Sequence, residues 1–389
     1  MPPNIASLLT LGFVIFLFQW DAKNGPKMDS ALWIPFWWIT IACSREWSDW
    51  FAIFGIPLPG GSFEGGNPIN RAFYLGLILL GLRILSKRSV QIGGIFANNI
   101  ILTLFLAYCF VSIAWTELPF VALKRWIKVV GQPIMALIIL TEPDPKRALI
   151  QVFKRCAFIL LPVSILLIKY YPEIGRGFGV WSGQPFNMGI TDGKNSLGVN
   201  CLLLGYLFTW HWIRTWRLEK GPSRKRELML CALLLYMNGW LTWMSDSKTP
   251  LVSLVLGLSI LIFTGMEWVN KKMVSVYLVG AGLAYAIADW FFNVFALILH
   301  LLGRDATLTE RTQLWPVLLK EDINPVFGVG FESFWIGKRL ERLWETLNWE
   351  CNSAHNGYLE TYLTLGLVGL GLLLAVLLAT YARSARDLL

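Results

Sequence analysis

Long apolar runs separated by short polar segments repeat along most of the chain. Because a helix needs about 20 mainly apolar residues to cross the hydrocarbon core of a membrane, the pattern predicts about eleven membrane-spanning helices, with a range of about ten to twelve. The range reflects a short run at residues 31–43 and a stretch at 47–59 that suits an interfacial or re-entrant segment. The predicted helices centre near residues 12, 37, 78, 104, 134, 159, 204, 236, 257, 284 and 369.

One long polar segment, residues 303–355, interrupts this pattern just before the last predicted helix. A loop of this length in a membrane protein usually carries function or is disordered. We therefore expect an all-α polytopic membrane protein, with a single transmembrane domain over residues 1–389 and its chemistry concentrated in this segment.

Composition supports the membrane class, since 55% of the residues are hydrophobic, only 15% are charged and 20 are tryptophan. The net charge of +9 does not indicate nucleic acid as a partner, because the Lys and Arg residues form short clusters between apolar runs. Five of the six cysteines lie in or beside apolar runs, and Cys351 stands alone in the long polar segment. No His, Cys and Glu spacing suits a metal, so we expect neither a metal site nor another cofactor.

The Lys-rich and Arg-rich loops predict the orientation of the chain. Loops that are dense in these residues and lack a site motif are expected on the cytoplasmic side. They contain Lys23 and Lys27, Arg83 to Arg88, Lys146 and Arg147, Arg214 to Arg226, Lys271 and Lys272, and Arg383 and Arg386. The alternate segments, 44–70, 116–126, 170–196, 244–249 and 303–355, are then expected on the periplasmic or outer side.

Two lysines on the predicted outer side are unusual. Lys248 lies in a short turn between apolar helices, where an ammonium is costly unless an anion receives it or it pairs with Asp246. Lys194 and Asn195 open an apolar helix behind glycines, where they either bind an anion or only start the helix. The order Gly-Lys-Asn-Ser lacks the spacing of a P-loop. Lys338, Arg339 and Arg342 are interpreted as a solvated helix face.

His355 is the acid/base candidate, because the ordinary pKa of histidine, near 6.5, lets the side chain accept a proton at neutral pH. The alternative is that it caps or positions the last helix. For His211 and His300 we expect only structural roles. An apolar body with outer cations and one histidine suits an anionic lipid-linked substrate.

Several motifs sharpen this hypothesis. They are His355-Asn356-Gly357-Tyr358-Leu359-Glu360 leading into Leu365–Leu370, Gly303-Arg304-Asp305 with Thr309-Glu310-Arg311-Thr312 and Trp315, Asn324-Pro325 to Gly328-Val329-Gly330-Phe331 and Trp335, Ser245 to Thr249, and Gly189-Ile190-Thr191 with Lys194-Asn195 and Leu197-Gly198. Over roughly residues 100–380 the chain resembles the O-antigen ligase and Wzy polymerase superfamily, and it is most similar to the ExoQ-like exopolysaccharide polymerase branch.

The resemblance implies a metal-independent glycosyltransferase of the GT-C type, which moves a glycan from undecaprenyl pyrophosphate onto an acceptor hydroxyl. It implies that Arg311 and Lys248 clamp the pyrophosphate and that His355 activates the acceptor. We expect further substrate contacts from Lys194, Asn195, Arg304, Thr309, Asn356 and Glu360. Lys248 stands where the ligase branch typically has arginine, which favours the polymerase branch.

Together with the charge pattern, the resemblance implies an inverting polymerase that joins lipid-linked repeat units into exopolysaccharide, in the inner membrane with its active site facing the periplasm. Its partners would be the lipid-linked glycan, the growing polysaccharide or another acceptor, and the flippase and chain-length regulator of such a system. The alternative is a ligase that transfers the glycan to another lipid or to a protein. A transporter or flippase is less expected, because it needs charged or broken helices near the midplane of the membrane, whereas these cations gather on one face.

Overall fold

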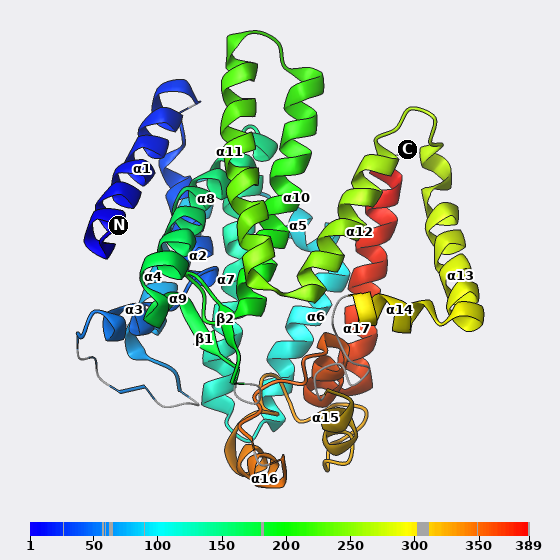
Figure 1. The fold of residues 1–389 in the computed structure, drawn as a ribbon. Coiled ribbons are helices and arrows are strands. Elements are labelled where there is room, and N and C mark those ends of the chain that lie inside the picture. The colour runs from blue at the N-terminus through cyan, green and yellow to red at the C-terminus, as the bar shows by residue number, and fades with distance from the viewer. Residues whose placement is uncertain are drawn as a thin grey trace. The chain divides into compact units, whose positions relative to one another are not determined.

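The structure is a computed structural model of residues 1–389. It describes residues 1–25, 27–56, 58, 60–61, 65–88, 90–179, 183–301, 311–347 and 349–387, with the backbone alone at 92, 301, 311–313 and 387. Figure 1 shows a largely helical chain with one small hairpin. The strands β1 (Arg176–Phe178) and β2 (Pro185–Asn187) pair antiparallel, with Gly177 opposite Phe186.

The first helices are α1 (Pro3–Asn24), α2 (Trp33–Ala42), α3 (Trp47–Ile53), α4 (Pro68–Lys87), α5 (Ile92–Asn98), α6 (Ile100–Val111), α7 (Pro119–Leu140), α8 (Pro145–Tyr170) and α9 (Pro172–Gly175). The later helices are α10 (Lys194–Leu218), α11 (Pro222–Ser245), α12 (Lys248–Thr264), α13 (Val274–Phe292), α14 (Val294–Leu301), α15 (Arg311–Leu318), α16 (Gly337–Leu347) and α17 (Gly357–Asp387). Short 3₁₀ turns lie at Ser30–Leu32, Ser112–Trp115 and Lys271–Met273.

All eleven predicted centres fall inside a helix, but the predicted number of membrane spans is not confirmed. Within the described residues, six helices are long and apolar enough to cross a membrane, namely α1, α4, α8, α11, α13 with its preceding turn, and α17. The apolar helices around residues 37, 104 and 257 are shorter. Two further helices contain a predicted centre, α7 and α10. The helix α7 carries the cations Lys124, Arg125 and Lys128, and α10 is interrupted by polar and aromatic residues. Both are therefore less apolar than a typical span.

The chain divides into two compact units. Unit 1 comprises residues 1–61, 66–90 and 132–265, and unit 2 comprises residues 62–65, 91–131 and 266–389. The prediction of a single transmembrane domain stays a prediction.

Unit 1 is built on α8, α10, α11 and α1. Apolar side chains from all four helices form its core, including Leu17, Phe158, Phe208, Leu234 and Leu241. The helices α10 and α11 form a long antiparallel hairpin (Figure 1) that turns at Gly221, whose φ of 92° lies in the left-handed region.

A buried network of charges joins the same four helices. Lys154 Nζ lies 2.9 Å from Asp21 Oδ1 and 3.1 Å from Glu227 Oε1. Arg155 Nε donates to Asp21 Oδ2 at 3.0 Å, and His211 Nε2 lies 2.9 Å from Glu227 Oε1. The Lys154 side chain is 5% exposed and that of Asp21 is 1% exposed. Charges buried this deeply persist only when they are paired, so the network holds the four helices in one register.

The connecting segments of unit 1 lie at two opposite ends of its helices, as their contacts show. The charge network, the start of α8 and the loop between α10 and α11 lie at one end. At the other end, Asn187 Nδ2 donates to Met244 O at 2.9 Å and Arg45 Nη2 donates to Ile174 O at 2.6 Å. The first end carries Lys146, Arg147 and the Arg214–Arg226 cluster. This grouping of basic segments at one end agrees with the alternation of cytoplasmic and outer segments that the Lys and Arg positions predict.

Unit 2 contains the segment that the sequence presented as one long loop. Its described part is packed rather than extended, since it forms α15 and α16 and has a core of its own. Phe334, Leu343, Ala354 and Leu363 are each 0–1% exposed in that core. A second core joins Cys109, Ile113 and Ala122 to Phe331 and Leu365. The loop that carries His355 therefore rests on a folded support.

Candidate active site

The helix α17 is broken at Gly366, where φ is 64° and ψ is −164°. A break frees backbone groups, and inside a membrane water cannot satisfy them. The segment 324–331 supplies the partners instead. Leu367 N donates to Pro325 O at 2.9 Å and Val368 N donates to Val326 O at 3.1 Å. In the other direction, Val329 N donates to Leu363 O at 3.3 Å and Gly330 N donates to Thr364 O at 2.8 Å. Tyr108 of α6 completes the set by donating to Leu365 O at 3.0 Å.

Glycines make this close approach possible. A Cβ at Gly366 would lie 2.3 Å from the carbonyl carbon of Val326, and a Cβ at Gly328 would lie 2.4 Å from Thr364 O. A Cβ at Gly330 would lie 2.3 Å from Thr116 Cγ2. The Gly328-Val329-Gly330 motif and Gly366 are thus two halves of one backbone junction.

His355 lies just before α17, in a loop whose backbone is tightly held. Its φ is 51°, its side chain is exposed, and its Nδ1 lies 3.2 Å from Ser353 Oγ. The preceding residue, Ala354, is 0% exposed. Its carbonyl accepts from Trp315 Nε1 at 2.9 Å and its N–H donates to Glu360 Oε2 at 2.8 Å. The imidazole therefore projects to the surface from a rigid support.

Asn356 and Glu360, both predicted to bind substrate, have their side chains engaged in the fold. Asn356 Oδ1 caps α17 by accepting from Tyr358 N at 3.1 Å and from Leu359 N at 3.3 Å. Glu360 Oε1 accepts from Trp335 Nε1, and its other oxygen accepts from Ala354. Glu360 thus ties the start of α17 to the His355 loop and to the residues before α16.

In unit 1, the turn that carries Lys248 packs on the start of α10. Asp246 has a left-handed φ of 48°, and its Oδ1 lies 2.6 Å from Lys248 Nζ. Ser247 Oγ donates to Asn195 Oδ1 at 2.8 Å. The structure therefore brings Asn195 against the Lys248 turn, and it contains the Lys248–Asp246 pair of the alternative interpretation.

Lys194, the first residue of α10, is half-buried. Its Nζ lies 5.8 Å from the centroid of the Phe186 ring on β2, within cation–π range. The hairpin thus holds this ammonium beside Asn195, so three predicted site residues share one end of unit 1.

Arg45, which the sequence reasoning missed, lies at this same end. Its side chain follows α2, is 8% exposed, and stacks 5.7 Å from the centroid of the Trp50 ring. Burial lowers its pKa from the usual value, and the carboxylates of Asp192 and Asp49 act in the opposite direction. Among the described residues, its buried Nη1 finds no hydrogen-bond partner. The signal that could have found Arg45 is a cation directly after an apolar helix on the predicted outer side, as at Lys248, although the 44–70 segment is longer than the Lys248 turn.

The remaining predicted residues have no described side chains. Arg304 and Thr309 lie outside the described residues, and Arg311 begins α15 with its backbone alone described. The cluster on α16 is only partly solvated, because Arg339 stacks 5.5 Å from the centroid of the Phe334 ring and lies 3.9 Å from Glu321. Arg342 is 66% exposed.

Comparison of the sequence with known proteins finds two matches. The Wzy_C family, described as O-antigen ligase, matches residues 231–374, which include the Lys248 turn, the backbone junction and the His355 loop. The chain is also 25% identical over 327 residues to the exopolysaccharide production protein ExoQ of Rhizobium meliloti (strain 1021). That match covers 81% of this chain and 70% of ExoQ. No solved structure matches the chain.

Residues 231–374 thus match the O-antigen ligase family, and most of the chain is similar to ExoQ, which confirms the resemblance that the motifs indicated.

We expect Gly366→Ala to destabilise the protein by about 2 to 4 kcal/mol, because alanine neither adopts this φ and ψ nor fits against Val326. The measurement is the apparent melting temperature of the purified protein in detergent. Gly371→Ala is the matched control, since a Cβ there meets no atom within 4 Å. It should melt within a few degrees of wild type. Equal melting temperatures of the two variants would contradict the inference that the junction requires glycine at position 366.

Proposed function

We propose that this chain is a membrane glycosyltransferase that polymerises undecaprenyl-pyrophosphate-linked oligosaccharide repeat units into exopolysaccharide. The observation that carries the proposal is that one family match spans both the Lys248 turn and the His355 loop. Each presents an exposed or half-exposed ionisable side chain from a turn or loop that hydrogen bonds hold in place. The name of the similar ExoQ protein favours exopolysaccharide as the product.

Cations at the pyrophosphate would supply most of the rate enhancement. Negative charge grows on the pyrophosphate as the glycosidic bond breaks, so fixed cations stabilise the transition state more than the ground state. We assign this role to Lys248 and Arg311, with support from Lys194. Since these side chains supply the positive charge, we propose that the reaction needs no metal.

The Lys248–Asp246 pair is compatible with this role. The two side chains are 30% and 65% exposed. An exposed pair of this kind contributes about 0 to 1 kcal/mol. A pyrophosphate carries more charge than one carboxylate, so it can displace Asp246 from Lys248 at little cost.

His355 would take the proton from the acceptor hydroxyl as the bond to the sugar forms. The acceptor oxygen attacks the anomeric carbon, the carrier pyrophosphate leaves, and the proton passes to the imidazole. One displacement of this kind inverts the anomeric centre. Glu360 and Asn356 act in this scheme by positioning the His355 loop, whereas Arg304 and Thr309 keep their proposed role in binding the glycan or its pyrophosphate.

The end of unit 1 that carries Lys194 and Lys248 would face the periplasm from the inner membrane. The opposite end carries the Arg214–Arg226 cluster, which the positive-inside rule places in the cytoplasm. No ATP is available outside the cytoplasm, so the activated donor itself must supply the free energy for the transfer.

A broken helix also occurs in transporters, which makes α17 the feature that favours a transport function. In transporters the unwound backbone faces the substrate or ion. In α17 the freed groups around Gly366 are instead bonded to the segment 324–331. The junction is therefore occupied by the protein itself, which favours a fixed scaffold over a transport site.

The test is to incubate the purified full-length protein with a synthetic undecaprenyl-pyrophosphate oligosaccharide and to measure the sizes of the glycan products. We expect a ladder that grows by one repeat unit per step and persists in EDTA. Transfer of a single glycan onto an added lipid or protein acceptor, without a ladder, would identify the ligase. Absence of any transfer under conditions where the protein remains folded would contradict both.

We expect His355→Gln to lower the rate by about 100-fold or more while the affinity for the donor stays near wild type, because the amide cannot accept the acceptor proton. In wild type the rate should fall as the pH drops, since a protonated imidazole accepts no further proton. That acidic limb should be absent in His355→Gln. An unchanged acidic limb in the variant would show that His355 only positions the acceptor.

Lys248→Met should lower the transfer rate by about 10- to 100-fold, because one cation is lost from the leaving group while Arg311 remains. Lys338→Met is the matched control, since Lys338 is exposed on α16 and has no assigned role. Both variants are assayed at saturating donor. Equal rates in the two variants would place Lys248 outside the pyrophosphate site.

A further inference from the structure

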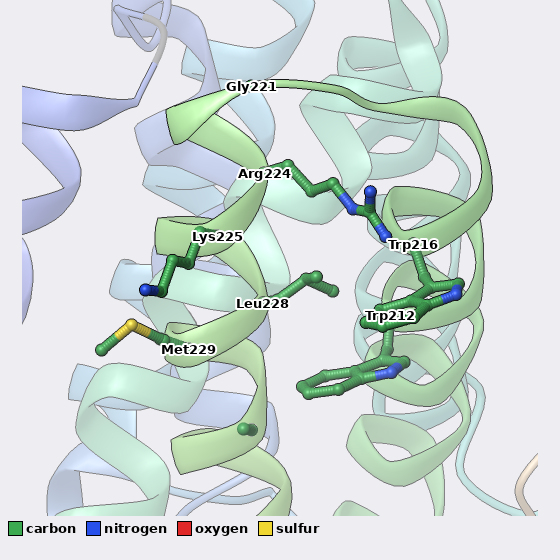
Figure 2. A pocket seen from close by; sticks show the side chains of 8 residues that line it. Trp212, Trp216, Gly221, Arg224, Lys225, Leu228 and Met229 are labelled. Atoms are coloured by element: carbon green, nitrogen blue, oxygen red, sulfur yellow. The ribbon is translucent and has the colours of Figure 1, made fainter.

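A pocket of about 410 Å³ opens between α10 and α11, at the end of unit 1 opposite Lys194 and Lys248. It therefore lies apart from the proposed transfer site. Figure 2 shows the Arg224 side chain reaching toward Trp216, and Leu228 pointing toward the ring of Trp212. The side chains that line it include Trp212, Trp216, Arg224, Lys225, Leu228 and Met229.

The polarity of the pocket is ordered along the helices. Arg224 and Lys225 lie in the first turn of α11, next to the loop that joins the two helices. One turn further along α11 are Leu228 and Met229, with Ala232 beyond them. Met229 is 60% exposed, so an apolar surface stays uncovered just below the cations. This order of charge, then aromatic ring, then aliphatic chain matches the interface of a membrane.

The cations at the mouth of the pocket have no anionic partner in the described part of the chain. Arg224 lies over the Trp216 ring, 4.6 Å from its centroid, and neither it nor Lys225 pairs with a carboxylate there. The nearby carboxylate of Glu227 is already bonded to Lys154 and His211.

The other cations of this cluster are used differently. Arg217 Nη1 donates to Gly265 O at 3.2 Å, and Arg226 Nη1 donates to Asn24 Oδ1 at 2.9 Å. Between residues 214 and 227 there are six Lys and Arg residues against two Glu, a local net charge of +4. Two of these cations, Arg224 and Lys225, thus line a pocket with an apolar floor, where a ligand can neutralise them.

We propose that this pocket binds one anionic phospholipid, with its phosphodiester on Arg224 and Lys225 and an acyl chain along Trp212, Leu228 and Met229. A free anion would leave the apolar floor uncovered, and a zwitterionic lipid would compensate its own phosphate with its choline or amine. The bound lipid bridges α10 and α11 beside their connecting loop and stabilises the hairpin whose other end carries Lys194.

The experiment uses the purified full-length protein in detergent with equal amounts of dioleoyl phosphatidylglycerol and dioleoyl phosphatidylcholine, followed by native mass spectrometry. We expect wild type to retain phosphatidylglycerol at about 10-fold higher occupancy than phosphatidylcholine. Arg224→Gln/Lys225→Gln should lose this preference, whereas Arg224→Lys/Lys225→Arg should keep it.

The matched control is Lys146→Gln/Arg147→Gln, which removes two exposed charges at the same end of unit 1, outside the pocket. It should retain phosphatidylglycerol as wild type does. Equal loss in this control, or retained preference in Arg224→Gln/Lys225→Gln, would overturn the proposal. Displacement of the lipid by millimolar inorganic phosphate would assign the cations to a soluble anion, and a dimer mass that disappears with Arg224→Gln/Lys225→Gln would assign the pocket to a second copy of the chain.

Discussion

The structure depends on one constraint, which is that polar groups inside a membrane must find partners within the protein. The break at Gly366 shows how the chain meets it. The segment 324–331 places two carbonyls and two N–H groups against the freed groups of α17, and glycines at 328, 330 and 366 let the two backbones approach. A polar segment far from the helix in sequence is thereby fixed to it. The same junction supports the start of α17, where Asn356 and Glu360 hold the loop that carries His355.

The same constraint shapes unit 1. Lys154 lies between Asp21 and Glu227, and each of these carboxylates also meets a second basic side chain. Because removing one member would leave an uncompensated buried charge, the network couples α1, α8, α10 and α11 more strictly than apolar contacts alone. Apolar packing tolerates small shifts along a helix, whereas paired charges fix the register. The opposite ends of these helices therefore carry the Lys194 helix start and the Lys248 turn in a defined arrangement.

Apolar periodicity was enough to predict the membrane class and a helix at every expected centre, and short motifs were enough to indicate the family. The number of spans could not be predicted, because α2, α6 and α12 are apolar but short, and α7 is long but carries charges. The core within residues 311–363 was also missed, because Phe334, Leu343 and Ala354 are too widely spaced to show a helical period. Pairings across the chain, such as Tyr108 with Leu365, leave no local signal at all.

The candidate site separates residues that hold the backbone from residues that remain for chemistry. The motif grouped Asn356, Glu360 and His355 as site residues. In the structure the side chain of Asn356 accepts from backbone N–H groups, and that of Glu360 accepts from a backbone N–H and from Trp335. The imidazole of His355 is exposed. Conversely, Arg45 belongs to no motif, and its buried guanidinium keeps one nitrogen without a partner in the described residues. A buried donor costs free energy unless something accepts from it. Within the described part of the chain, Arg45 therefore has an unsatisfied hydrogen-bond donor at the same end of unit 1 as Lys194 and Lys248, and only the packing of the chain reveals it.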